Sequence, residues 1–111
     1  MTSVSDLTIP LSALEWGDDG QATAMAGDWS AIEIGVLLQA VVERAAGSLV
    51  EAAPLHTVSV TFDVSFPVAP GSEIQFASRI DRRTRTLIFA SGVARQGDSH
   101  ILKSTIVFRI G

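Results

Sequence analysis

The sequence predicts a single α+β domain in which one long helix packs against an antiparallel sheet. Residues 30–52 are apolar around most of the helix circumference, which is typical of a buried helix. From about residue 56 to residue 110 the pattern changes to alternating apolar and polar positions, which predicts strands. A chain of 111 residues has the length for one hydrophobic core, so we expect residues 1–111 to form one domain.

The residues before the helix predict a hairpin. Residues 7–16 are partly apolar and include Pro10, which suits an edge strand at a position where no ladder hydrogen bond is required. Residues 17–20 read Gly-Asp-Asp-Gly, the composition of a turn, and residues 21–25 are expected to return as the second strand.

Local signals place both ends of the helix. Ser30 and Glu33 match a capping box, in which the serine oxygen accepts from the third helical amide and the glutamate reaches back to the cap. Pro54 is expected to stop the helix. A helix over residues 30–52 would be on the order of 30 Å long, enough to cross a whole sheet.

Four strands are expected after the helix. Alternate residues from 58 to 66 are apolar, so one face of the first strand is predicted to meet the core. Pro67, Pro70 and Gly71 predict a turn, and strands over about residues 73–80, 87–94 and 100–110 complete a meander.

The composition favours a self-associating cytoplasmic protein. The hydrophobic fraction is 47% and the charged fraction is 18%, so we expect a second copy of the chain to cover apolar surface. The apolar run over residues 34–42 is too short for a membrane span, and the first residues lack the features of a secretory signal. With no cysteine and two histidines, no metal site is expected.

The bases are concentrated in one short segment. The formal net charge is -4, yet residues 79–85 hold Arg79, Arg82, Arg83 and Arg85. Guanidinium groups match phosphate oxygens, so this cluster is either a phosphate site or a solvated hairpin tip. Binding to duplex nucleic acid is not expected, because the sequence pI is about 4.9 and aromatic residues are missing around the cluster.

The order of the elements resembles the hotdog fold of acyl-CoA thioesterases, in which an antiparallel sheet wraps a long central helix. Residues 57–71 look like the strand and turn after the helix in the phenylacetate-pathway thioesterase branch, where a proline and a glycine stand four residues apart, as Pro67 and Gly71 do. The resemblance covers residue 28 to the C-terminus. It implies a homodimer, or a dimer of dimers, that hydrolyses an acyl-CoA thioester at the subunit interface, with coenzyme A as part of the substrate and no separate cofactor.

The resemblance also implies catalytic residues. In that branch an acidic residue lies eight positions after a glycine, and Gly35 and Glu43 have this spacing. Glu43 would activate water or attack the thioester carbonyl, and the Gly35 amide would polarise that carbonyl. The branch has a histidine where this chain has Ile34, and some members have a hydroxyl where it has Gly47. A rival hypothesis is therefore a hotdog protein that binds an acyl thioester or another apolar ligand without turnover, or serves as an assembly module.

Two alternatives concern the helix start. If Ser30 caps the helix, the Gly35 amide is already bonded to the Ala31 carbonyl and cannot polarise a substrate. If the helix starts near Ile34, the Gly35 amide is free and the capping box is accidental.

Further residues are candidates for substrate binding. Asp28 lies in the loop where the branch often has an amide side chain, and it would approach Glu43 only across a dimer interface. Asp63 is expected at the solvent side or an interface, with substrate contact as the alternative. The phosphates of coenzyme A are the candidate ligand of the arginine cluster, chiefly of Arg82, Arg83 and Arg85.

Overall fold

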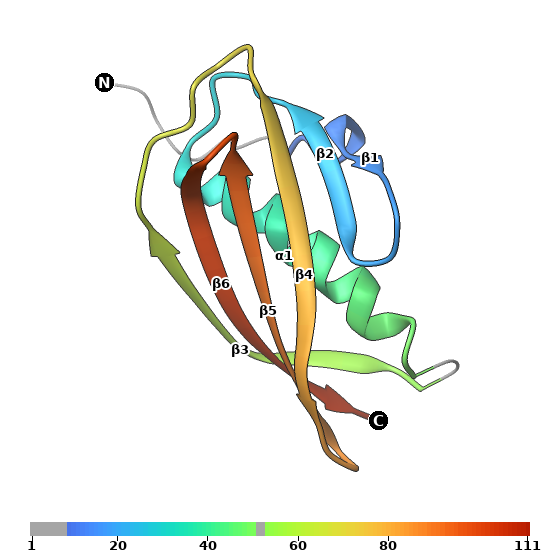
Figure 1. The fold of residues 1–111 in the computed structure, drawn as a ribbon. Helices are drawn as coiled ribbons and strands as arrows, with labels where there is room; N and C mark the ends of the chain where they lie inside the picture. Colours follow the sequence, from blue (N-terminus) through green and yellow to red (C-terminus); the bar gives the residue numbers. More distant parts are fainter. Residues whose placement is uncertain (1–8, 51–52) are drawn as a thin grey trace.

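The structure, a computed structural model that describes residues 9–50 and 53–111, has one long helix and a six-stranded antiparallel sheet. In chain order the elements are η1 (Leu11–Ala13), β1 (Glu15–Trp16), β2 (Gln21–Met25), α1 (Ala31–Gly47), β3 (Leu55–Val64), β4 (Glu73–Arg83), β5 (Leu87–Gln96) and β6 (Ser99–Ile110). The strand order is β1-β2-β4-β5-β6-β3, and the curved sheet wraps one side of α1 (Figure 1). The predicted α+β class is confirmed.

The hairpin before the helix is shorter than expected. Of the strand predicted over residues 7–16, residues 7 and 8 lie outside the described residues, and only Glu15–Trp16 is a strand. Pro10 has φ -82° and ψ 54°, which is not extended, and a 3-10 turn follows it. The predicted turn and return strand are present: Gly20 has φ 75°, and the Gly17 amide donates to the Gln21 carbonyl.

The capping box forms as predicted. The Ser30 oxygen accepts from the Glu33 amide at 3.4 Å, and Glu33 Oε1 accepts from the Ser30 amide at 3.1 Å. The helix ends at Gly47, earlier than the predicted residue 52. The chain then tightens into turns, since the Leu49 and Val50 amides donate to carbonyls only three residues back.

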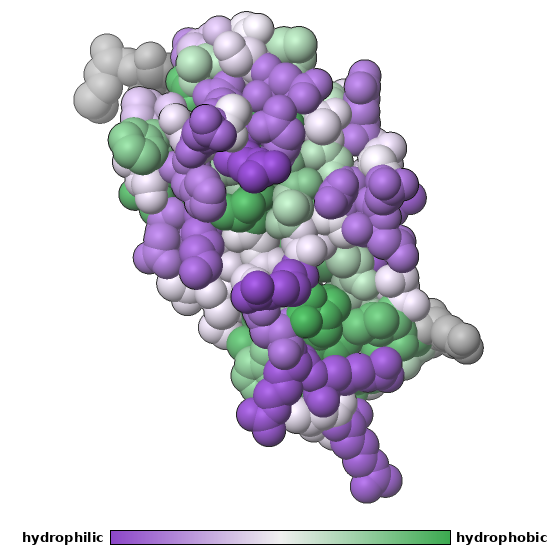
Figure 2. Space-filling view, viewed as in Figure 1, coloured by the Kyte–Doolittle hydropathy of each residue, from purple (hydrophilic) through white to green (hydrophobic). Residues whose placement is uncertain are grey.

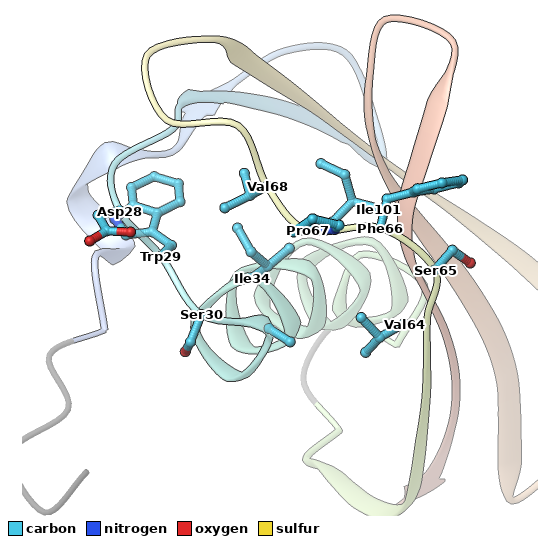
Figure 3. A pocket seen from close by; sticks show the side chains of 11 residues that line it. Asp28, Trp29, Ser30, Ile34, Val64, Ser65, Phe66, Pro67, Val68 and Ile101 are labelled. Atoms are coloured by element: carbon cyan, nitrogen blue, oxygen red, sulfur yellow. The ribbon is translucent and has the colours of Figure 1, made fainter. Parts of the chain in front are cut away.

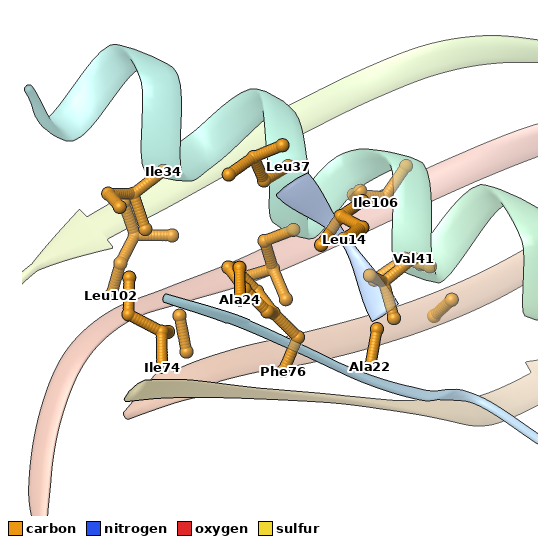
Figure 4. Packing of buried hydrophobic residues seen from close by; sticks show 14 of the residues in the cluster. Leu14, Ala22, Ala24, Ile34, Leu37, Val41, Ile74, Phe76, Leu102 and Ile106 are labelled. Atoms are coloured by element: carbon orange, nitrogen blue, oxygen red, sulfur yellow. The ribbon is translucent and has the colours of Figure 1, made fainter. Parts of the chain in front are cut away.

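The core lies between the inner face of the sheet and one side of α1. Ile34, Leu37 and Val41 point from α1 toward the buried side chains of β4 and β6 (Figure 4). Those sheet residues are Ile74, Phe76, Leu102, Ile106 and Phe108. Because α1 packs mainly on β4, β5 and β6, its N-terminal end is held beside the start of β6 and the end of β3.

Strand β3 differs from the prediction. The alternation predicted one face in the core, but only Leu55 and Val60 pack against it, and both are half-buried. Val58, Phe62 and Val64 are exposed, as is Phe66 just beyond the strand. The reason is position: β3 is the edge strand next to β6, and α1 contacts it only slightly. A long strand therefore presents apolar side chains and one unpaired edge.

Candidate functional site

A pocket of about 450 Å³ lies at the N-terminal end of α1 (Figure 3). Its apolar walls come from three separate segments: Trp29 and Ile34, Val64 to Val68, and Ile101. The volume falls within the range of small-molecule sites, which are mostly apolar with a few polar groups. The pocket can therefore take an apolar ligand.

Besides the side chains of Asp28, Ser30 and Ser65, the pocket is bordered by backbone amides of the first turn of α1. The capping box satisfies the amides of Ser30 and Glu33, while those of Ala31 and Ile32 have no hydrogen-bond partner among the described residues. Ser30 and Ala31 line the pocket. Free amides and the positive end of the helix dipole favour a negatively charged oxygen here.

Asp28 is the predicted site residue that the structure brings to this pocket. It lies at the outer rim, beyond Trp29, and its side chain is exposed (Figure 3). The expected loop position is therefore correct, and a role in substrate binding stays a prediction.

The role of Gly35 as an oxyanion donor does not carry over to this structure. With Ser30 as the cap, Gly35 is the fifth helical residue, so its amide belongs to the regular hydrogen bonds of the helix. Gly35 is also covered, because a Cβ built on it would lie 3.3 to 3.5 Å from the ring of Phe62. The first of the two sequence alternatives is the one that the structure adopts.

Glu43 lies away from the pocket within one chain. Its side chain is exposed, it forms no ion pair among the described residues, and it does not line the pocket at the start of α1. Twelve residues separate it from Ala31, or about 18 Å along the helix. Eight positions rotate Glu43 by about 80° from Gly35, so it does not share the face of α1 that meets Phe62.

The arginines lie at the opposite end of the sheet from the pocket. Figure 2 shows hydrophilic side chains gathered around the tip of the β4–β5 hairpin, which projects away from the start of α1 (Figure 1). Arg83 donates to the Leu49 carbonyl at 3.0 Å, and Arg82 lies 5.7 Å from the centre of the Phe89 ring. Arg85 is exposed. Two of the three candidate phosphate ligands thus have partners in the fold.

Asp63 is on the sheet face that points away from α1. It pairs in register with Lys103 of β6, and both are exposed, whereas the next β6 residue, Ser104, is buried on the inner face. This position matches a solvent-side or interface residue. It does not bring Asp63 to the pocket.

The sequence prediction missed the pocket walls. The sequence patterns mark none of Trp29, the Val64 to Val68 segment and Ile101 as a site residue. One local signal was available, since Trp29 immediately precedes the helix cap and is a large apolar residue where the chain enters the helix.

The family model of the acyl-CoA thioesterase N-terminal domain matches residues 25–109. The chain belongs to this family. The match covers α1, the four long strands and the pocket. No curated protein matches the chain.

Solved structures support the same fold. A phenylacetic acid degradation-related protein from Ralstonia eutropha JMP134 matches at TM-score 0.73 and 16% identity, over 95% of this chain and 93% of its own. Thioesterase superfamily member 2 from Mus musculus matches at TM-score 0.74 and 16% identity, over 88% of this chain and 80% of its own. A Bacillus halodurans protein solved with CoA matches at TM-score 0.76 and 11% identity, over 88% of this chain and 71% of its own. The predicted hotdog fold is confirmed.

Two kinds of feature are absent from the described residues. No helix within residues 9–50 and 53–111 is long and apolar enough to cross a membrane. The same residues contain no group of three or more His, Cys, Asp or Glu side chains placed to hold a metal ion.

Proposed function

We propose that this protein hydrolyses an acyl-CoA thioester as a homodimer, with the thioester carbonyl bound at the N-terminal end of α1. One observation carries the proposal: in a chain of the acyl-CoA thioesterase family, an apolar pocket is lined by Ala31, whose helix amide is free, as is the next amide, that of Ile32. The amides suit the oxygen that becomes negative when water attacks a thioester. The pocket suits the acyl group.

The edge of β3 supports the homodimer. A second copy that pairs antiparallel along this edge continues the sheet and covers Val58, Phe62 and Val64, and also approaches the exposed Ile32 on the neighbouring flank of α1. Obligate interfaces bury apolar surface of this kind.

The register of β3 gives such a pair a specific form. Val58 is the extra residue of a bulge between Thr57 and Ser59. If Val60 lies beside Val60 of the partner subunit and Val58 stays unpaired, then His56 faces Asp63 of the partner subunit on the outer face. The arrangement occurs twice across the two-fold axis, so an imidazole and a carboxylate meet at two positions.

The same symmetry supports a role for Glu43. The start of α1 lies near the end of β3, and the end of α1 lies near the start of β3 (Figure 1). Antiparallel pairing of two β3 strands therefore moves the Glu43 half of one helix toward the pocket of the other subunit. It also moves the partner's Arg85 to the pocket end of the sheet, where it can meet the phosphates of coenzyme A.

The proposed reaction uses these groups in turn. The amides of Ala31 and Ile32 donate to the thioester oxygen. Glu43 of the partner subunit takes a proton from water as the water oxygen attacks the carbonyl carbon. The carbon–sulfur bond then breaks and the proton passes to sulfur, which leaves a carboxylic acid and the free thiol of coenzyme A.

Ala31→Pro tests the amide without disturbing the helix. Proline is favoured at the first helical position, and Ser30 already has the extended conformation that must precede it, with ψ 168°. Loss of one oxyanion donor is expected to lower kcat by about 10²–10³-fold. Thiol release is measured with short, long and aromatic acyl-CoAs, and circular dichroism checks that the fold is kept. Absence of thiol release by the wild-type protein would reject hydrolysis.

Mixing variants tests whether the site is shared. In a dimer of one Ala31→Pro and one Glu43→Gln subunit, one of the two sites keeps both native groups only if Glu43 acts in the other subunit. Refolding the two inactive variants together should then restore about a quarter of the wild-type activity, because half of the dimers are mixed. No recovery would place Glu43 in its own subunit's site or outside catalysis.

A binding function without turnover is the second candidate. It is favoured by Ile34, which lines the pocket at the position where the related branch has a histidine. Thermal stabilisation by acyl-CoA without thiol release would select this function.

A further inference from the structure

A proline-containing loop forms one wall of the pocket. Residues 65–72 run from the end of β3 to the start of β4, and Pro67 and Val68 of this loop line the pocket together with Ile34 of α1 (Figure 3). Val68 also packs against the hydrophobic core. The position of this loop therefore decides how much of an acyl group the pocket can contact.

The backbone holds this loop at its two ends. At the start, the Ser65 amide donates to the Ile101 carbonyl at 2.9 Å. At the end, the Gly71 amide donates to the Ala26 carbonyl at 2.8 Å. Between these anchors two of the four residues 67–70 are prolines, which have no amide hydrogen to donate. The middle of the loop therefore has few backbone donors with which to hold itself in place.

One side chain, that of Gln96, supplies the hydrogen bonds in the middle of the loop. Its Oε1 accepts from the Ala69 amide at 2.9 Å, and its Nε2 donates to the carbonyls of Ala69 at 2.9 Å and Ser72 at 3.2 Å. Among the described residues, no other hydrogen bond reaches residues 67–70. Gln96 is the last residue of β5, and β6 lies between β5 and β3, so pairing of two subunits along β3 does not require these three bonds to change.

A loop wall that is already in place favours binding. If the wall became ordered only when a ligand filled the pocket, each backbone residue fixed on binding would weaken the affinity by roughly 5–30-fold. The Gln96 amide uses both of its ends on this one loop and orders it without a ligand.

We propose that Gln96 is a positioning residue, which holds residues 67–70 as a preformed wall for the acyl group. This inference rests on the proposed function, in which the thioester carbonyl lies at the Ala31 amide. Gln96 does not line the pocket itself and acts through Val68, which does. Its effect therefore grows with the length of the acyl group, because a short group ends near the carbonyl and leaves most of the wall uncontacted.

Gln96→Met tests the inference, because methionine has a similar length but lacks the amide that makes the three hydrogen bonds. Binding of non-hydrolysable S-alkyl-CoA thioethers is measured by titration calorimetry. The variant should bind long thioethers roughly 5–30-fold more weakly than the wild type, and short ones equally well. In turnover, KM should rise with acyl length while kcat stays unchanged, because the free amides and Glu43 are kept. Gln96→Ala should give the same pattern.

Hydrogen exchange locates the effect in the loop. Gln96→Met should remove the protection of the Ala69 amide and keep that of the Gly71 amide, which bonds to the backbone. Ser78→Ala is the matched control, since it deletes a side-chain hydrogen bond of 3.0 Å to the Gly20 carbonyl, and neither residue lines the pocket. It should change neither the binding of long thioethers nor the exchange at Ala69.

The outcomes are distinct. If Gln96→Met binds every length as the wild type does, or if Ser78→Ala weakens the long thioethers equally, Gln96 is not a positioning residue. A fall in kcat at every acyl length would also contradict the inference, because the effect would then lie at the reacting groups. If the wild-type protein binds no thioether at all, the proposed function fails and the inference fails with it.

Discussion

The distance between α1 and the sheet depends on a glycine, which gives the sharpest stability prediction. Gly92 is buried in the middle of β5, beneath Leu38 and Val42. A Cβ at this position would lie 2.7 Å from Val42 Cγ2 and 2.9 Å from Leu38 Cδ1. Carbon atoms pack best at about 3.5–4.0 Å, so Gly92→Ala must displace both side chains or lift the helix.

Gly92→Ala is expected to lower the free energy of unfolding because it overpacks the core. Forcing a methyl group into a packed core costs about 1–3 kcal/mol, and the lower chain entropy of alanine in the unfolded state offsets about 0.4–1 kcal/mol of it. We expect a net loss of about 1–2 kcal/mol. For a domain of this size that lowers Tm by roughly 4–10 °C.

Gly47→Ala is the matched control because it adds the same methyl group at an open position. No atom lies within 4 Å of its Cβ position, and Gly47 is the last helical residue with no positive φ. Here the substitution should stabilise by about 0.5–1 kcal/mol. Both variants are compared by thermal and urea unfolding at one protein concentration, because the proposed self-association would make Tm concentration-dependent. Equal stability of Gly92→Ala and wild type would refute the packing argument.

Two further predictions concern charges. Burial acts to raise the pKa of Asp81, but hydrogen bonds from Ser91 and Arg79 and the nearby positive charges outweigh it and hold that pKa below its ordinary 3.8. This contribution to stability is present at neutral pH and lost as the pH falls through the lowered pKa. Asp81→Asn should therefore lower Tm slightly at pH 7, match the wild-type Tm below the lowered pKa, and so flatten the acid side of a Tm-against-pH curve. His56→Asp and Asp63→His should each weaken self-association in sedimentation equilibrium, because each places two like side chains opposite one another, and the double variant should restore it; failure of that rescue contradicts the proposed register.

Local chemistry made much of the fold predictable. The capping box depends on two residues three positions apart, and both halves form. The long strands follow from period-two alternation, which is also a local property. The first strand was overestimated because Pro10 turns the chain where the apolar residues suggested an extended segment.

The exposure of β3 was not predictable in the same way. Alternation shows that a strand has two unlike faces, but it does not show what covers them. That depends on the sheet order, in which β3 pairs with β6 and no further strand of the described residues follows. The pocket has the same origin, since Ile34, Val64 and Ile101 meet only once the sheet has formed.

The two lines of sequence reasoning about Gly35 could not both be right. The family spacing assigned it a free amide, whereas the capping box committed that amide to the helix. The structure follows the capping box, because two reciprocal hydrogen bonds fix the helix start at Ala31. The free donors therefore lie one turn earlier, at Ala31 and Ile32.

That shift changes what Glu43 can do. A helix is rigid, so the separation of about 18 Å between Glu43 and the Ala31 amide cannot be closed by motion within one chain. A glutamate side chain is much shorter than this. If Glu43 is the base, it must act on a substrate held by another subunit, and catalysis then requires the dimer. Variants of His56 or Asp63 that dissociate the dimer should accordingly lose turnover in proportion, although neither residue lies at the pocket. Full activity in a dissociated variant would remove Glu43 from the reaction.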